Sequence, residues 1–108
     1  MTVKEITEVL SLEVFCMPDA DREVEGGYAG DLLSWVMGRA NAGNAWITIM
    51  SNVNIVAVAT LADPSCIILS EGVLPDNDTL DKARSVGVNL LGSKKATFDT
   101  CVDISKLL

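Results

Sequence analysis

The most constraining feature of this 108-residue sequence is a regular succession of short apolar runs and helical patterns. From residue 45 onward, apolar runs begin about every twenty-two residues, at 45–50, 66–70 and 88–92, and one helical pattern separates each pair. These runs hardly alternate between polar and apolar residues, as is usual for strands covered on both faces. The spacing is that of successive strand–helix units, whose strands pair in parallel. We therefore predict one domain over 1–108 with a three-layer α/β fold, in which helices cover both faces of a mostly parallel sheet.

Capping and turn signals place the remaining elements. Thr2 and Glu5 form a capping box in front of a helical pattern. Asp31 is expected to cap a helix over 31–40, and Gly87 to end a helix in the left-handed conformation. The other expected elements are strands at 12–16 and 23–28, and helices at 3–10, 53–62, 78–86 and 95–107.

Charge and the absence of histidine exclude several classes of function. Eight Lys and Arg against fifteen Asp and Glu give a net charge of −7, which repels a polyanion, so no nucleic-acid polymer is expected as a partner. The chain contains no His, which excludes Ser-His-Asp and Cys-His catalysis and His-ligated metals. We expect no enzymatic activity, no cofactor and no metal.

The three cysteines point to a reducing compartment. Cys16, Cys66 and Cys101 lie far apart, form no Cys-x-x-Cys pair and are odd in number, so we expect buried thiols and a cytoplasmic protein. The uncharged segment 40–62 contains four asparagines, whose amides are costly in hydrocarbon. We expect no association with a membrane.

Polar residues follow the predicted strands at the edge where ligands of parallel sheets usually bind. This is the edge at which the carboxyl ends of the strands and the N-termini of the next helices converge. A lysine pair and a serine at the start of the last helix form the best candidate for anion binding. The predicted ligand-binding residues are Ser51, Asn52, Asn54, Glu71, Gly72, Ser93 and Lys94.

The same residues also have a purely structural interpretation. Ser51, Asn52 and Ser93 are ordinary helix-capping residues, and Glu71 with Gly72 could form a plain turn. Lysines in a first helical turn are usually solvated, although they oppose the helix dipole there. The amide of Asn54 fits this interpretation least, because a polar group inside an apolar helix needs a partner.

The helix expected over 31–40 is more apolar than one sheet can cover. A domain of this size buries only about two-thirds of its unfolded surface, so some apolar side chains stay outside. A symmetric second copy is the commonest cover for such a surface. We expect a twofold homodimer, with Leu32, Trp35 and Val36 at its interface.

Four segments of the sequence resemble the DRTGG domain, here standing alone. They are Arg22-Glu23-Val24-Glu25-Gly26-Gly27-Tyr28-Ala29-Gly30-Asp31-Leu32-Leu33-Ser34, Trp46-Ile47-Thr48-Ile49, Asn54-Ile55-Val56-Ala57-Val58-Ala59 and Ile67-Ile68-Leu69-Ser70-Glu71-Gly72. The resemblance implies a fold similar to the N-terminal domain of HPr kinase/phosphorylase and a regulatory role. It implies no kinase chemistry, because the sequence lacks the Gly-x-x-x-x-Gly-Lys-Ser/Thr phosphate loop.

Two functions follow as hypotheses. The first is a non-catalytic regulatory module that binds a small polar or anionic metabolite, such as a nucleotide, and signals through an interface. The alternative is an interaction or accessory subunit without a small-molecule ligand, whose surplus of apolar residues forms a partner-binding face.

Overall fold

The three apolar runs form the centre of a five-stranded sheet. The computed structural model describes all 108 residues. Strands β3 (Ala45–Thr48), β4 (Cys66–Leu69) and β5 (Leu90–Gly92) lie side by side in parallel, and every residue in them is buried. Since helices cover both faces, these strands have no polar face. The predicted parallel pairing is confirmed for this part of the sheet.

Two further strands form the edges of the sheet. The short strand β2 (Gly27–Ala29) pairs in parallel with β3. The strand β1 (Glu13–Cys16) pairs with β5 in the antiparallel sense, with an irregularity in register between Val14 and Cys16. The order is therefore β1-β5-β4-β3-β2.

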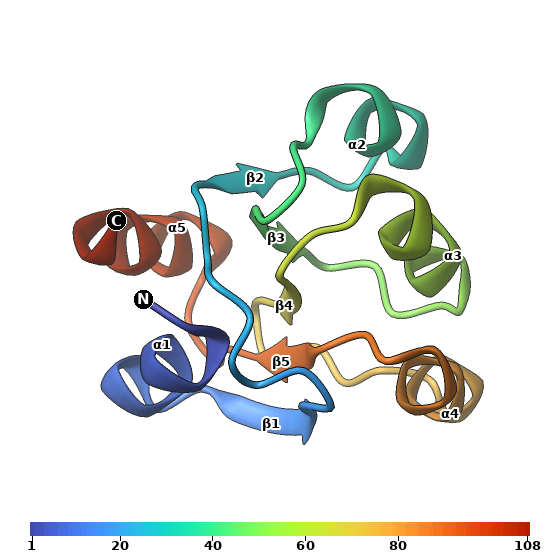
Figure 1. Ribbon diagram of the computed structural model, residues 1–108, viewed down its shortest axis with the longest axis horizontal. Coiled ribbons are helices and arrows are strands. Elements are labelled where there is room, and N and C mark those ends of the chain that lie inside the picture. The colour runs from blue at the N-terminus through green and yellow to red at the C-terminus, as the bar shows by residue number, and fades with distance from the viewer.

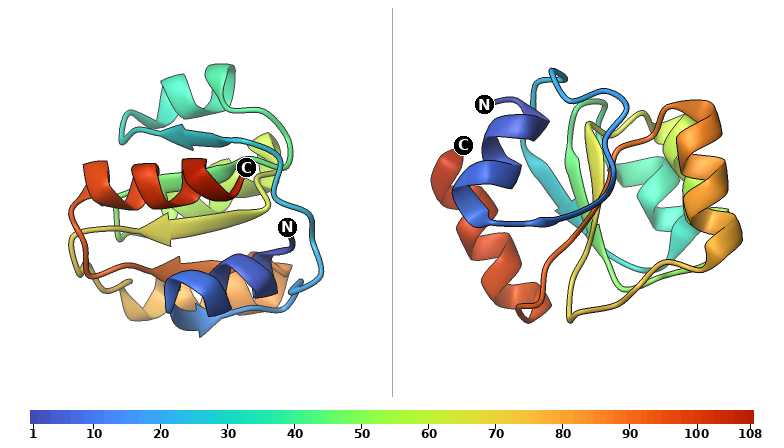
Figure 2. Two further views of the ribbon diagram at one scale, coloured as in Figure 1. Left: turned by 90° about the vertical axis from the view of Figure 1, so that its left-hand side faces the viewer. Right: turned by 90° about the horizontal axis from the view of Figure 1, so that it is seen from below.

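Five helices complete the three layers (Figures 1 and 2). One face is covered by α2 (Leu33–Arg39), α3 (Asn54–Ala62) and α4 (Asn77–Val86), and the other by α1 (Val3–Leu10) and α5 (Thr97–Leu107). The right-hand view of Figure 2 shows the sheet between these two groups of helices. The predicted three-layer α/β fold is confirmed. None of the helices is both long and apolar enough to cross a membrane.

Each face of the sheet has its own apolar core, because side chains of a strand alternate between the two faces. Trp46, Ile67 and Leu69 pack under α2, α3 and α4. Ile47 and Ile68, their neighbours in the strands, pack under α1 and α5. The large buried side chains thus position the loops at the sheet edge from both sides.

The predicted ends of two helices are confirmed. The Thr2 hydroxyl accepts a hydrogen bond from the main-chain N–H of Glu5 at 3.1 Å, and the Glu5 carboxylate accepts one from the N–H of Thr2 at 2.9 Å. At the end of α4, Gly87 has φ +81° and its N–H donates to the carbonyl of Ala83. Both arrangements satisfy main-chain groups that a helix end leaves unpaired.

The strand predicted over 23–28 is largely wrong. Only Gly27–Ala29 forms a strand, and Glu23 makes an isolated bridge with Thr2. The segment before it turns toward the N-terminus instead: the N–H of Val3 donates to the carbonyl of Arg22, and the N–H of Val24 donates to that of Met1. Pairing with the start of α1 therefore satisfies main-chain groups that the prediction assigned to the sheet.

The predicted cap at Asp31 is also wrong. Helix α2 begins at Leu33, after Leu32, without a side-chain cap. The Asp31 carboxylate accepts hydrogen bonds from the Thr48 hydroxyl at 2.7 Å and from the N–H of Ile49 at 3.0 Å. Asp31 thus ties the end of β2 to the end of β3, because the parallel register brings these two strand ends together.

Candidate ligand site

The connections leaving β4 and β5 go to opposite faces of the sheet. The chain after β4 leads to α4, and the chain after β5 leads to α5 on the other face (Figure 1). In an open parallel sheet, ligands bind where neighbouring connections diverge in this way. The predicted residues Glu71, Gly72, Ser93 and Lys94 belong to these two connections.

Hydrogen bonds between the two loops close the crevice at this position. The N–H of Glu71 donates to the carbonyl of Lys95 at 2.8 Å, and the N–H of Gly72 donates to that of Ser93 at 2.9 Å. The hydroxyls of Ser70 and Thr97 add a bond of 2.6 Å. The loops therefore support each other, and their main-chain groups are used within the protein.

The predicted anion site at the start of the last helix is occupied by the chain itself. Helix α5 begins at Thr97 rather than near 95, so Lys94 and Lys95 precede it. The Glu71 carboxylate accepts a hydrogen bond from the N–H of Thr97 at 2.8 Å. Glu71 thus supplies the negative charge that the helix N-terminus favours, at the helix end where the sequence predicted an anion.

The predicted residues that follow β3 lie apart from this pair of loops. The carbonyl of Ser51 accepts hydrogen bonds from the Thr79 hydroxyl at 2.7 Å and from the N–H of Asp76 at 3.1 Å. The Asn52 side chain accepts from the N–H of Asn54 at 3.0 Å. Asn54 is the exposed first residue of α3, so its amide needs no buried partner. The helix cap expected at Ser51 or Asn52 is wrong, because the residue before α3 is Val53, whose side chain does not cap this helix.

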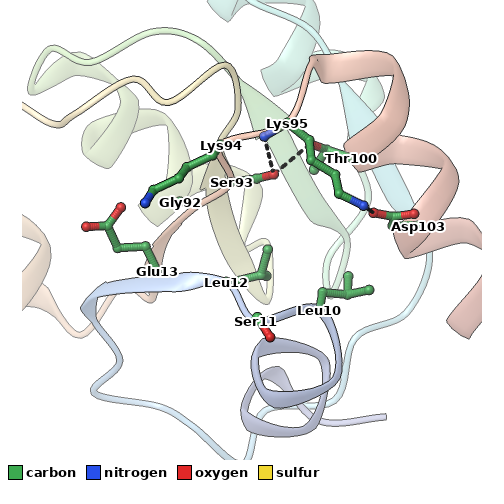
Figure 3. A pocket seen from close by; sticks show the side chains of 10 residues that line it. All are labelled: Leu10, Ser11, Leu12, Glu13, Gly92, Ser93, Lys94, Lys95, Thr100 and Asp103. Atoms are coloured by element: carbon green, nitrogen blue, oxygen red, sulfur yellow. Dashed lines mark hydrogen bonds and ion pairs between the residues drawn. The ribbon is translucent and has the colours of Figure 1, made fainter.

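One cavity nevertheless opens beside β5 at the same edge. Its volume is about 430 Å³, and it lies between the β5–α5 loop and the α1–β1 turn (Figure 3). Of the predicted residues, only Ser93 and Lys94 line it. Ser51, Asn52, Asn54, Glu71 and Gly72 line none of the three cavities. The full lining is Leu10, Ser11, Leu12, Glu13, Gly92, Ser93, Lys94, Lys95, Thr100 and Asp103.

The charged groups of this cavity are two lysines and two carboxylates, of which only one lysine forms an ion pair. The Lys95 ammonium lies 2.8 Å from the Asp103 carboxylate, which raises the pKa of Lys95 above its ordinary value of 10.5. Lys94 makes no salt bridge, and Figure 3 shows its side chain extended along the cavity on the same side as Glu13. Lys94 is therefore the cation that an anion in this cavity meets without breaking an ion pair.

The Ser93 hydroxyl is already engaged in hydrogen bonds. The Thr100 hydroxyl donates to the carbonyl of Ala96 at 3.0 Å, so in the 2.9 Å contact between Ser93 and Thr100 the Ser93 hydroxyl is the donor. Ser93 also accepts from the N–H of Lys95 at 3.2 Å. Its proton is not free for a ligand, and Ser93 instead positions the lysine-bearing loop.

Sequence reasoning missed the wall of the cavity that comes from the start of the chain. Ser11 lies in the α1–β1 turn and Glu13 begins β1; they reach the carboxyl end of β5 only because β1 runs antiparallel to it. The register places Glu13 opposite Gly92. The predicted mostly parallel sheet did not say which strand runs antiparallel, so it did not bring this turn to the carboxyl end of β5. The only indication of this wall in the sequence was that polar residues stand at the start of a short predicted strand.

Two smaller cavities lie elsewhere. One of about 260 Å³ is mostly apolar and lies between β2 and α5. The other, of about 250 Å³, lies at the opposite end of the sheet and includes Arg22 and Asp63, whose ion pair measures 2.9 Å. The cavity beside β5 is the candidate ligand site, because it combines the largest volume with a lysine free of ion pairs.

The predicted interface on α2 needs one correction. Val36 is 1% exposed and packs in the core under α2, so it is not available to a partner. Leu32 and Trp35 are 56% and 51% exposed. The Arg39 guanidinium stacks on the Trp35 ring, 3.6 Å from its centroid. Met37 is also exposed, but residues two apart in a helix do not share a face, so it lies on the other side of Val36 from Trp35. The predicted interface therefore keeps Leu32 and Trp35 and loses Val36, because the helix turns Val36 toward the sheet.

All three thiols are free, and none is activated. Burial raises the pKa of Cys66 to about 12 and raises the pKa of Cys16 and of Cys101 above their ordinary value of 9.0. A raised thiol pKa lowers the share of reactive thiolate at neutral pH. The predicted burial is confirmed for Cys16 and Cys66, whereas Cys101 is partly exposed.

Comparison with known proteins identifies a structural neighbour. No protein-family model matches the chain, and no curated protein matches it. The fold is similar to the crystal structure of the CBS and DRTGG domains from the regulatory region of Clostridium perfringens pyrophosphatase, complexed with its activator diadenosine tetraphosphate. The TM-score is 0.73 at 15% sequence identity, over 91% of this chain and 43% of that one. This chain thus spans less than half of its neighbour and is similar in fold to that part of it.

Proposed function

We propose that this chain is a DRTGG-like regulatory module that binds a small anionic metabolite beside β5 and signals through an interface with a partner. The observation that carries the proposal is the cavity of about 430 Å³ that contains Lys94, a cation without an ion pair. Volumes of about 300 to 1,000 Å³ are usual for small-molecule sites. A phosphate or carboxylate is the group that a lysine ammonium binds best.

The structural neighbour supports an anionic ligand. In the pyrophosphatase, the region of similar fold belongs to a regulatory unit complexed with a diadenosine tetraphosphate. From this neighbour we infer only the chemical class of the ligand, a nucleotide phosphate, and none of the residues that contact it. The net charge of −7 makes a single local lysine cluster the natural place for such an anion on this chain.

The position of the cavity offers a route for the signal. Its walls come from the α1–β1 turn and the β5–α5 loop, which lie far apart in the sequence. A ligand that touches both walls stabilises one relative arrangement of α1 and α5. These helices form one outer face of the molecule (Figure 2), so binding alters a surface that a partner can contact.

We further propose that the module catalyses no reaction. The hydroxyls nearest the lysines, on Ser93 and Thr100, are engaged within the protein, and the pKa of each thiol is raised rather than lowered. The chain also lacks His for general base catalysis. The functions that we propose instead are ligand binding and a change at the interface with a partner.

A homodimer is the second part of the proposal. It is favoured by the exposed apolar residues Leu32 and Trp35 at the start of α2, since large exposed apolar side chains can mark interaction surfaces. An accessory subunit that uses this surface and binds no metabolite is the alternative function. The two functions differ in whether a ligand stabilises the isolated protein.

Thermal unfolding in the presence of diadenosine tetraphosphate, ATP and pyrophosphate tests the ligand site. A ligand that binds only the native state at a hundred times its Kd stabilises by about 2.7 kcal/mol, which raises the melting temperature. Lys94→Glu should abolish the increase, whereas Lys82→Glu, an equal charge change on the exposed surface of α4, should leave it unchanged. No increase with any of the three anions would favour the accessory subunit. An equal increase in both variants would contradict the cavity beside β5 as the ligand site.

A further inference from the structure

The free edge of β2 carries main-chain groups that nothing in the protein binds. In the ladder with β3, the carbonyl of Gly26 accepts from the N–H of Ala45, and the N–H of Gly30 donates to the carbonyl of Ile47. A parallel ladder uses the groups of alternate residues. Gly27 and Ala29 therefore point their N–H and carbonyl groups away from β3, and both residues are exposed.

This edge lacks the protection that the other edge of the sheet has. Exposed edge strands usually carry a lysine, a proline or a bulge that prevents further pairing. β1 has an irregular register and is followed closely by Pro18, whereas β2 consists of Gly27, Tyr28 and Ala29 and pairs regularly. Only its short length limits pairing at β2.

An apolar groove lies directly beside the unprotected edge. The cavity of about 260 Å³ is lined by Gly27 and Ala29 on the strand side, and by Cys101, Ile104 and Leu108 of the α5 side. Tyr28 also lines the groove, but its ring packs against the core on the other face of the sheet. The strand therefore adds little side chain of its own to the groove, because the other two residues are a glycine and an alanine. A strand that pairs with β2 would send alternate side chains into this groove.

The charges at the ends of β2 indicate the partner. Glu25 precedes the strand and Asp31 follows it; both are exposed, and neither has a cation within salt-bridge distance. Oδ1 of Asp31 accepts the bonds from Thr48 and Ile49, which leaves Oδ2 for a partner. A second copy of this chain, paired antiparallel across Tyr28, would bring Glu25 of one copy opposite Asp31 of the other. Like charges opposite each other destabilise strand pairs, so the edge disfavours its own copy.

We propose that the β2 edge binds an extended segment of another protein by strand addition. The segment carries small or β-branched apolar residues at alternate positions, with Lys or Arg at its ends. Main-chain bonds to Gly27 and Ala29 provide affinity, the groove selects the apolar residues, and Glu25 with Asp31 select the basic ends. The site lies at the opposite edge of the sheet from β1 and the anion cavity. The proposed peptide binding therefore does not depend on whether a metabolite binds in that cavity.

Selection from a library of short random peptides tests this assignment. We expect the intact protein to enrich peptides with alternating apolar residues and basic ends. For one enriched peptide, amide resonances of Gly27 and Ala29 should shift in a saturable manner. Ala29→Pro removes an outward N–H and should weaken binding at least about tenfold. Proline is tolerated where the N–H of an edge strand faces solvent, and circular dichroism would confirm the fold.

Two more variants keep the test independent of that substitution. Glu25→Lys should also weaken binding and should shift the selection away from basic ends, whereas Lys94→Glu in the anion cavity should have no effect. Failure to enrich such peptides, or shifts remote from β2, would overturn the assignment. So would a dimer that protects the Gly27 and Ala29 amides and dissociates on Ala29→Pro, because the occupant would then be a second copy.

Discussion

The Glu71 carboxylate accepts a hydrogen bond from the main-chain N–H of Thr97 at 2.8 Å, and so the loop after β4 caps helix α5. The backbone of Glu71 lies in the left-handed region, with φ +61°. That conformation costs a non-glycine residue about 1 to 2 kcal/mol. The cap and the cost of the backbone conformation can be separated by substitution.

Glu71→Ala should lower the free energy of unfolding by about 1 kcal/mol, because it removes the cap and keeps the unfavourable backbone conformation. Glu71→Gly also removes the cap but relieves the conformation, so it should be more stable than Glu71→Ala by about 1 kcal/mol. Urea unfolding of the three proteins measures both differences. Equal stability of the two variants would contradict the backbone part of the argument.

Gly92 is required by the approach of Phe15. A Cβ atom at this position would lie 2.7 Å from Cε2 of the Phe15 ring. Gly92→Ala should therefore lower the free energy of unfolding by about 1 to 3 kcal/mol. Phe15→Leu in the same chain should reduce the additional cost of the alanine, and a double-mutant cycle measures this coupling.

Gly38 provides the matched control for that substitution. It lies within α2, and nothing approaches its Cβ position within 4 Å. Gly38→Ala should raise the free energy of unfolding by up to about 1 kcal/mol, since alanine favours a helix interior. If both alanines had the same effect, crowding by Phe15 would not be the cause at Gly92.

Two carboxylates make the stability depend on pH in the acid range. The capping box lowers the pKa of Glu5 below its ordinary value of 4.5, and the hydrogen bond from Arg22 lowers the pKa of Asp63 below 3.8. A carboxylate whose folded pKa is lowered contributes stability above its unfolded pKa. The free energy of unfolding should therefore fall as the pH falls from the ordinary values through the lower, folded values.

Glu5→Gln combined with Asp63→Asn should flatten this dependence. Glutamine keeps the capping box, and asparagine suits the left-handed conformation of Asp63, at φ +57°. Chemical unfolding at several pH values below neutrality gives the slope. Glu8→Gln serves as the control, because the exposed Glu8 side chain makes no hydrogen bond, and it should leave that slope unchanged.

The exposed side chains of Leu32 and Trp35 predict association of two copies. Sedimentation at micromolar concentration and moderate salt should show a dimer, and low salt should weaken it, because each copy carries a net charge of −7. Trp35→Glu should shift the protein toward the monomer. Phe98→Glu replaces an aromatic residue that is 76% exposed on α5 and should have no effect. A monomeric native protein would contradict the homodimer, and a dimer insensitive to Trp35→Glu would place its interface elsewhere.

The sequence by itself determined the elements whose signals are local. The apolar runs of β3, β4 and β5 were predictable because a strand buried on both faces needs no polar residue. The capping box at Thr2 and the left-handed Gly87 were predictable because their hydrogen bonds join neighbours in the chain. These features together imply the three-layer architecture.

Only the tertiary structure decided which polar residues meet. Asp31 binds Thr48 rather than its own helix, and Glu71 occupies the helix end that the sequence offered to an anion. Glu13 enters the cavity because β1 runs antiparallel beside β5. In the sequence, a carboxylate that caps a nearby helix cannot be distinguished from one that caps a helix far along the chain. The partner depends on the order and direction of the strands, and contacts between residues far apart in the sequence determine both.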